Sequence, residues 1–153
     1  MSEGFDFFKV GDEVTFSKTV SESDVYGFAG ITGDFSPNHV NQAYMARTAY
    51  GERIAHGALI VGYMSTASTY MLAKADREVV SYGYDRVRFV KAVLIGDTID
   101  VRYVIASVLP KERRTLADVT VTNQRGEVVA VATHIGYFPV PFGAAAASER
   151  AAT

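Results

Sequence analysis

The 153-residue chain contains no cysteine, which excludes a disulfide framework, a thiolate nucleophile and any metal site built on thiolates. It also lacks a basic cluster: the net charge is −2, and the densest basic stretch is residues 111–114 (KERR). Nucleic-acid and membrane-surface binding both require a more basic face. We therefore expect no nucleic-acid partner and no membrane association, and we expect a reducing, cytoplasmic location.

Long hydrophobic runs are also missing. The most apolar stretch, residues 58–73, is interrupted by glycine, serine and threonine, and is too short and polar to span a membrane. The first residues show no charged segment followed by an apolar one, so no secretory signal is expected. With 48% hydrophobic and 21% charged residues, the chain has the balance of one globular domain. We place that domain at residues 1–142 and expect the alanine-rich tail, 143–153, to be mobile.

The first half of the chain predicts one strand followed by helices. Residues 13–20 alternate as a strand, and Ser21 or Ser23 can cap a helix over 24–30 that Gly33 ends. The inner side of this helix is expected to carry Val25, Phe28, Ala29 and Ile31. An irregular segment and a short helix within 41–47 should follow. Residues 57–73 then predict a long helix that is apolar on nearly its whole circumference, which indicates that protein surrounds it.

The second half predicts strands over 86–90, 98–108, 116–122 and 128–137, joined by short turns. One strand, then helices, then several antiparallel strands indicate an α+β domain with one buried helix packed on a curled sheet. A single helix cannot cover both faces of such a sheet. We therefore expect a second subunit to cover the remaining apolar surface, in a symmetric dimer.

The clearest chemical pattern is a carboxylate and an imidazole, Asp34 and His39, on either side of Pro37. Gly57 then opens the long apolar helix, whose first N–H groups can hold a developing oxyanion. An acid/base pair beside such a helix end suits chemistry at a carbonyl. Taken alone, Asp34 would more simply cap the turn at Pro37, and His39 would be a satisfied, partly buried imidazole. His56 and His134 are interpreted as structural.

Three segments together resemble the hydratase motif of the MaoC-like, (R)-specific enoyl-CoA hydratase family. They are residues 33–39 (GDFSPNH), 48–51 (TAYG) and 54–57 (IAHG). Residues 82–89 (YGYDRVRF) and 95–99 (IGDTI) resemble the strand entries of the same family, so the similarity covers roughly residues 8–140. It implies the hot-dog fold, in which a curled antiparallel sheet wraps a long central helix, here about residues 57–73.

The resemblance also implies roles for individual residues. Asp34 and His39 match the catalytic pair that holds the reacting water, and the Gly57 N–H matches the donor to the thioester oxygen. Ser65 lies where the family often has a helix serine or threonine that supports the pair. Asn41 is a weaker candidate for a polar contact. The implied reaction is hydration of a 2-enoyl thioester to the (R)-3-hydroxyacyl thioester, without metal or cofactor.

Several alternatives remain open from the sequence. The substrate carrier is CoA or acyl carrier protein, the physiological direction is undetermined, and so is which member of the pair deprotonates water. A hot-dog thioesterase would use Asp34 to activate water against the carbonyl carbon. A non-catalytic, thioester-binding subunit of a heterodimeric dehydratase is the third hypothesis. Bulky tyrosines in and after the long helix either shorten the acyl tunnel or offer hydroxyls to a polar acyl group; they are Tyr63, Tyr70, Tyr82 and Tyr84.

Overall fold

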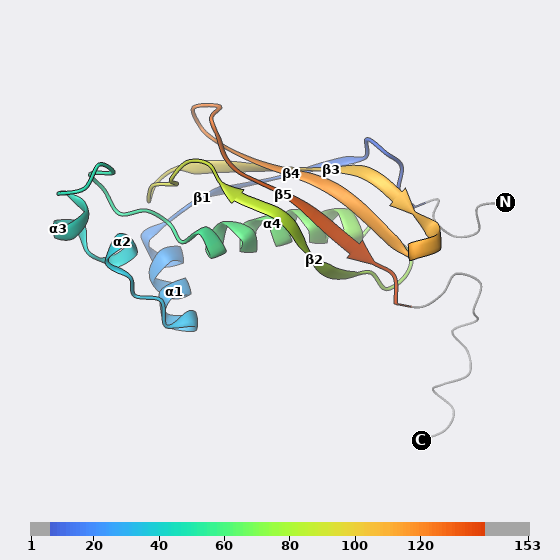
Figure 1. Ribbon diagram of the computed structural model, residues 1–153, viewed down its shortest axis with the longest axis horizontal. Helices are drawn as coiled ribbons and strands as arrows, with labels where there is room; N and C mark the ends of the chain where they lie inside the picture. Colours follow the sequence, from blue (N-terminus) through green and yellow to red (C-terminus); the bar gives the residue numbers. More distant parts are fainter. Residues whose placement is uncertain (1–6, 140–153) are drawn as a thin grey trace, which may run out of the picture.

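The computed structural model describes residues 7–139, which form a five-stranded antiparallel sheet with one long helix along one face (Figure 1). The sheet order is β1-β3-β4-β5-β2. This arrangement confirms the expected α+β architecture. The expected domain boundary at residue 142 and the tail over 143–153 lie outside the described residues.

The elements in chain order are β1 (Glu13–Thr19), α1 (Glu22–Thr32), α2 (Pro37–Val40), α3 (Gln42–Met45), α4 (Gly57–Leu72), β2 (Val80–Phe89), β3 (Thr98–Leu109), a 3₁₀ turn η1 (Pro110–Glu112), β4 (Arg114–Asn123) and β5 (Val128–Tyr137).

The core lies between α4 and the inner face of the sheet. From Ile99 to Ile105 every second residue of β3 points inward, because side chains alternate along a strand, and these inward residues are fully buried. They meet the apolar face of α4 and the inward residues of β4. Each such buried side chain contributes roughly 1.5–3 kcal/mol. The fully buried side chains at this interface include Ile99, Val101, Tyr103, Ile105, Met64, Ala67, Met71 and Val121.

Helix α4 is buried on one side only within the single chain. Its buried positions include Ile60, Met64 and Met71, whose spacing places them on one face. The opposite side includes Gly62 and Tyr70, and Tyr70 is 52% exposed. The prediction of a helix surrounded on all sides is therefore wrong for this chain by itself. None of the described helices is long and apolar enough to cross a membrane.

Helix α1 has two of the predicted end signals, Ser21 and Gly33, although it is two residues longer at each end than the predicted 24–30. Ser21 accepts a hydrogen bond from the Asp24 N–H, and the Asp24 carboxylate accepts one from the Ser21 N–H, which completes a capping box. Gly33 ends the helix in the left-handed conformation, with φ of 83°. Ile31 is 87% exposed, so its placement on the inner side was wrong. The expected irregular segment after Gly33 contains α2, for which Pro37 supplies a favourable first residue.

Strand β2 is longer and less regular than the predicted 86–90 segment. It pairs only with β5, and its register shifts between Ser81 and Gly83 and again between Asp85 and Arg88. Arg86, within the second shift, has φ of 53°, a left-handed conformation that few side chains adopt. The extra residues of these bulges interrupt the two-residue alternation, which is why the first half of β2 was missed.

Candidate active site

The turn after α1 presents Asp34 at the surface. Once Gly33 has ended the helix, the Asp34 carboxylate accepts a hydrogen bond of 3.2 Å from the Ser36 N–H through Oδ1. This is the turn-capping role expected of an aspartate before proline. A carboxylate has two oxygens and about four acceptor sites, so this bond leaves capacity for a water molecule. The structural and the catalytic roles of Asp34 are therefore compatible.

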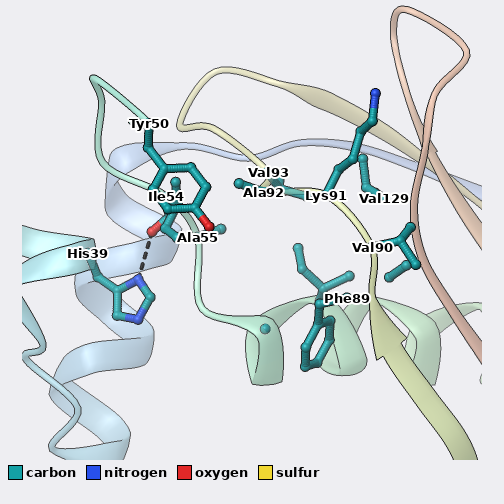
Figure 2. Close-up of a pocket in the computed structure, with 13 residues that line it drawn as sticks. His39, Tyr50, Ile54, Ala55, Phe89, Val90, Lys91, Ala92, Val93 and Val129 are labelled. Atoms are coloured by element: carbon teal, nitrogen blue, oxygen red, sulfur yellow. Dashed lines mark hydrogen bonds between the residues drawn. The ribbon is translucent and has the colours of Figure 1, made fainter. Parts of the chain in front are cut away.

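His39 lies on the short helix α2 and is held by the chain that precedes α4. Its Nδ1 lies 2.7 Å from the Ile54 carbonyl oxygen (Figure 2). Because a carbonyl only accepts, Nδ1 carries the hydrogen and donates it, and the lone pair of the neutral ring resides on Nε2. His39 is only 9% exposed. The ring is thus fixed in one tautomer that leaves a basic nitrogen available.

His56, the residue before α4, joins the two candidate catalytic residues. Its Nε2 donates to the Asp34 carbonyl oxygen at 2.9 Å, and its ring stacks on that of His39 with centroids 3.7 Å apart. The ring of Phe28 from α1 also packs against the His56 ring, with centroids 4.9 Å apart, and His56 is 2% exposed. The prediction that His56 hydrogen-bonds the loop is confirmed, but it did not include the stacking on His39. The one signal in the sequence that His56 lies at the site is its position directly before Gly57.

The three side chains Asp34, His39 and His56 form a compact polar cluster, whose potential ligand atoms all lie within 4.8 Å of one another. The two imidazole planes differ by only 27°. A cation at the usual distance of about 2.1 Å in the plane of one ring would lie far out of the plane of the other. The pair of histidines therefore fits a shared metal ion poorly, and the cluster is better suited to bind water.

A cavity of about 260 Å³ brings His39 and the start of α4 together (Figure 2). Gly57 forms part of its wall, and the ring of Phe89 lies directly against this glycine. A Cβ at position 57 would lie 2.6 Å from Phe89 Cε2, so the close packing requires glycine. The N–H groups of Leu59 and Ile60 donate to the His56 carbonyl oxygen, whereas the N–H of Gly57, at the first position of α4, has no acceptor within the helix. The other walls of the cavity are mostly apolar and include Tyr50, Ile54, Ile60, Val90, Val93, Val129 and Ala130.

Comparison with known proteins identifies the family of the chain. The family model described as MaoC like domain matches residues 7–129. The chain belongs to the MaoC-like family. An (R)-specific enoyl-CoA hydratase from Rhodospirillum rubrum is 34% identical to this MaoC-like chain over 125 residues, covering 82% of the chain and 84% of the relative. A 3-hydroxybutyryl-CoA dehydratase from Methylorubrum extorquens is 36% identical over 110 residues, covering 72% and 68% respectively.

Solved structures place the MaoC-like chain in the hot-dog fold. An unliganded R-hydratase from Pseudomonas aeruginosa superposes with a TM-score of 0.76 at 29% identity, covering 86% of this chain and 83% of that one. An (R)-hydratase from A. caviae gives a TM-score of 0.79 at 22% identity, covering 86% and 98%. At that identity the second likeness supports the fold alone. The predicted hot-dog architecture is confirmed.

Two weaker candidates of the MaoC-like site form no hydrogen bond with Asp34 or His39 in the part of the chain that the structure describes. Asn41 caps α3, where its Oδ1 accepts a 2.9 Å hydrogen bond from the Tyr44 N–H. Ser65 is two turns along α4 from Gly57 and lines a second cavity, of about 370 Å³, rather than the one that contains His39. A contact between Ser65 or Asn41 and a substrate therefore stays a prediction.

His134 is fully buried on β5 and has structural partners, as the sequence indicated. Its Nδ1 is 2.8 Å from the Tyr103 hydroxyl and its Nε2 is 2.8 Å from the Ser81 hydroxyl. Burial disfavours the charged imidazolium and lowers the pKa of His134 to about 4. His134 is accordingly neutral at physiological pH, and both of its nitrogens are occupied.

Proposed function

We propose that this MaoC-like domain catalyses the (R)-specific hydration of a 2-enoyl thioester and its reversal, the dehydration of an (R)-3-hydroxyacyl thioester. One observation carries the proposal: a single cavity joins His39 to Gly57 at the start of α4, and the Asp34 carboxylate lies within 4.8 Å of the imidazole cluster. Hydration needs a base for water, a proton donor for the α-carbon and a donor to the thioester oxygen. These residues can supply all three.

The fixed tautomer of His39 supports assigning it the role of base. Its Nδ1–H donates to the Ile54 carbonyl oxygen, so Nε2 is free to take one proton from water. The Asp34 carboxylate accepts a hydrogen bond from the other O–H of the same water and orients it, and that hydrogen stays on the product hydroxyl. The water oxygen bonds to the β-carbon as the π electrons shift toward the thioester oxygen. The imidazolium then returns its proton to the α-carbon. The overall addition is balanced, and both side chains end as they began.

The N–H of Gly57 is the proposed donor to the thioester oxygen. Negative charge develops on that oxygen as the enolate forms, and an N–H at the start of a helix combines a free hydrogen bond with the favourable helix dipole. Removing one such donor typically slows catalysis by about a hundredfold to a thousandfold. No bound metal or organic cofactor is required, because the thioester carbonyl itself acidifies the α-proton.

The test is conversion of crotonyl-CoA to 3-hydroxybutyryl-CoA, followed by loss of the enoyl absorbance and by chiral analysis of the product. Wild-type protein should form the (R) isomer. Asp34→Asn removes the carboxylate while keeping its shape, and should lower kcat by at least a hundredfold. The matched control is Asp100→Asn on the exposed side of β3, which should leave kcat unchanged. Full activity in Asp34→Asn would contradict the assignment.

Two other functions are tested by the same preparation. A thioesterase would direct the Asp34-bound water to the carbonyl carbon and would release a free thiol, which a thiol reagent detects. A non-catalytic subunit of a heterodimeric dehydratase would bind acyl-CoA without turnover. The exposed Asp34 and the free Nε2 of His39 favour the hydratase, because a silent subunit has no chemical need for them.

We further propose that the protein acts as a homodimer in the cytoplasm, on an acyl group carried by CoA or acyl carrier protein. Large apolar side chains are exposed on α4 and along β2 to the residue after it, and a second copy would cover them. Light scattering combined with gel filtration tests the dimer. The exposed side chains are Tyr70 (52%), Val80 (38%), Tyr82 (58%), Phe89 (53%) and Val90 (54%).

A further inference from the structure

His39 lies on a helix that is too short to hold it in place by itself. Helix α2 spans only four residues, and so short a helix is not stable in isolation. The His39 ring is nevertheless directed by one specific bond, from Nδ1 to the Ile54 carbonyl oxygen at 2.7 Å (Figure 2). The position and the tautomer of His39 therefore depend on the contacts that hold α2 and the segment around Ile54 in place.

Tyr26 of α1 holds the end of α2. Its hydroxyl donates to the carbonyl oxygen of Val40, the residue after His39, at 3.1 Å. Val40 is the last residue of α2, where a helix leaves its carbonyl oxygens without an internal partner. The same hydroxyl accepts a hydrogen bond of 3.2 Å from Arg53 Nη1. One tyrosine oxygen thus connects α1 to Val40 directly and to Ile54 through Arg53.

Arg53 connects the other side of His39 to the same helix. Its Nη1 donates to Glu22 Oε1 at 2.6 Å as well as to Tyr26, and its guanidinium carbon lies 5.9 Å from the centre of the Tyr26 ring. Glu22 and Tyr26 are four residues apart on α1 and therefore share one face of that helix. The hydrogen bond to Glu22 raises the pKa of Arg53, so its charge is permanent. Because Arg53 directly precedes Ile54, this anchor also holds the carbonyl to which His39 donates.

The peptide unit between Ile54 and Ala55 is held at both of its polar atoms. The Ala55 N–H donates to the Val93 carbonyl oxygen at 2.8 Å, and the Ile54 carbonyl accepts from His39. The two groups belong to one planar peptide and point in opposite directions. The Ile54 N–H donates in turn to the Asn38 carbonyl oxygen at 3.1 Å. The orientation of this peptide therefore decides which nitrogen of His39 carries the hydrogen.

The ion pair between Glu22 and Arg53 is suited to positioning rather than to stabilising the fold. The Glu22 side chain is 59% exposed, and an ion pair of this kind contributes little to the free energy of unfolding. By contrast, a displacement of about 1 Å in a catalytic group can lower a rate by about a hundredfold. Loss of these contacts should therefore affect turnover far more than stability.

We propose that Arg53 and Tyr26 are positioning residues, which together with Glu22 brace His39 from α1 and keep its hydrogen on Nδ1. We call these three residues the α1 brace. It does not meet the reacting atoms and acts only through the two carbonyl groups on either side of the His39 ring. The proposal rests on the proposed hydratase function, and it adds the residues that hold the base in place.

Kinetics of crotonyl-CoA hydration by the full-length protein test the α1 brace. Tyr26→Phe and Arg53→Gln should each lower kcat by about tenfold with little change in KM, because neither residue lines the cavity that contains His39. Arg53→Lys should recover part of the loss, since both side-chain bonds of Arg53 come from Nη1 alone. The matched control is Arg102→Gln, which breaks an exposed pair with Glu13 on the sheet and should leave kcat unchanged. A normal kcat in both Tyr26→Phe and Arg53→Gln would overturn the proposal.

The tautomer of His39 gives a readout that needs no turnover and that a merely structural role would not move. The chain has three histidines, so their ring ¹⁵N signals can be assigned by comparison with His39→Gln. At mildly alkaline pH, where imidazoles are neutral, the two nitrogens of His39 should show the widely separated shifts of a ring with hydrogen on Nδ1. In Tyr26→Phe/Arg53→Gln, well below its Tm, the two shifts should approach each other because both tautomers become populated.

The two measurements separate failure of the α1 brace from failure of the proposed function. Unchanged ¹⁵N shifts of His39 in Tyr26→Phe/Arg53→Gln would overturn the brace, whatever the activity of the protein. Absence of crotonyl-CoA hydration in the wild type would count against the proposed function, while the ¹⁵N shifts would still decide whether α1 holds the His39 ring.

Discussion

The imidazole rings of His39 and His56 are stacked with centroids 3.7 Å apart, and each ring donates to a different backbone carbonyl. His39 donates from Nδ1 to Ile54, whereas His56 donates from Nε2 to Asp34. The two tautomers are therefore opposite and both are fixed by oxygens that only accept. The stack links the turn that holds Asp34 to the chain before α4, so the acid/base pair is positioned through His56.

His56 should act on catalysis through position rather than through proton transfer. His56→Phe keeps a flat ring for the stack and loses the donor to the Asp34 carbonyl, whereas His56→Gln keeps a donor and loses the ring. We expect His56→Phe to lower kcat for crotonyl-CoA by about tenfold to a hundredfold, because small displacements of a catalytic group are costly. His56→Gln should retain more of kcat if the hydrogen bond dominates, and KM should change less than kcat in both.

The pH profile separates this positioning role from a catalytic one. Both His56 variants should keep the shape of the wild-type pH profile of kcat/KM, with only its height reduced. A variant in which one limb of the profile disappears would show that His56 itself exchanges protons during turnover.

Gly57→Ala should impair activity through Phe89 while preserving the N–H donor. The added methyl group would lie 2.6 Å from Phe89 Cε2, and Phe89 is 53% exposed, so its ring can swing aside with little loss of stability. The displaced ring belongs to the cavity wall, and we expect kcat/KM to fall by about tenfold to a hundredfold. Circular dichroism melting should show a nearly unchanged Tm.

The double variant Gly57→Ala/Phe89→Ala gives the control for this steric explanation. Removal of the ring leaves room for the methyl group, so the double variant should match Phe89→Ala alone in kcat/KM. If the double variant remains as impaired as the product of the two single effects, the methyl group acts on the helix N–H instead of on Phe89.

Stability should decline between pH 7 and pH 5 because of His134. Its pKa falls from 6.5 in the unfolded chain to about 4 in the folded one, so the unfolded chain binds more protons in this range. Stability therefore rises with pH and is lost as the pH falls from 6.5 toward 4. The free energy of unfolding in urea should be about 2 kcal/mol lower at pH 5 than at pH 7. His134→Gln should be less stable at pH 7 and should lack most of this dependence.

Asp97 should be the most sensitive carboxylate for stability. It is 4% exposed and accepts hydrogen bonds from the Leu94 N–H at 3.0 Å, Gln124 at 2.7 Å and Arg125 at 3.0 Å. Burial alone would raise the pKa of Asp97, but Arg125 and Gln124 outweigh it and the pKa is lowered. Asp97→Asn should lower the free energy of unfolding by about 1–3 kcal/mol in urea at pH 7. Asp100→Asn on the exposed side of β3 should change it by less than about 0.5 kcal/mol.

The sequence was sufficient wherever periodicity and a specific end signal coincided. The predicted long helix differs from α4 by one residue, the β5 strand was predicted with its observed bounds, and Gly33 ends α1 as expected. Ile31 was misplaced because hydrophobicity in the last turn of a helix does not reveal whether anything packs against it. The alternating pattern did not predict the first half of β2, because the bulges of this strand change the spacing of its inward residues. A search for strict two-residue alternation does not detect a strand that contains an inserted residue.

The candidate site was less predictable than the fold. The motif gave Asp34, His39 and Gly57, and the cavity joins the last two. The His39–His56 stack was not predicted, since residues 17 positions apart meet only after the intervening chain folds back. The position of Ser65 in a different cavity was also unexpected, because the resemblance gave its place on the helix but not the direction of its side chain.

The sheet order has a consequence for how the chain folds during synthesis. β1 is the first strand to emerge, yet its only partner is β3, and Glu13 pairs with Val104. Until β3 has left the ribosome, β1 and the apolar face of α4 have no sheet to pack on, and closing so long a loop is slow. Nascent chains that stop before residue 98 should therefore be the aggregation-prone species, and chaperones should bind them in preference to longer chains.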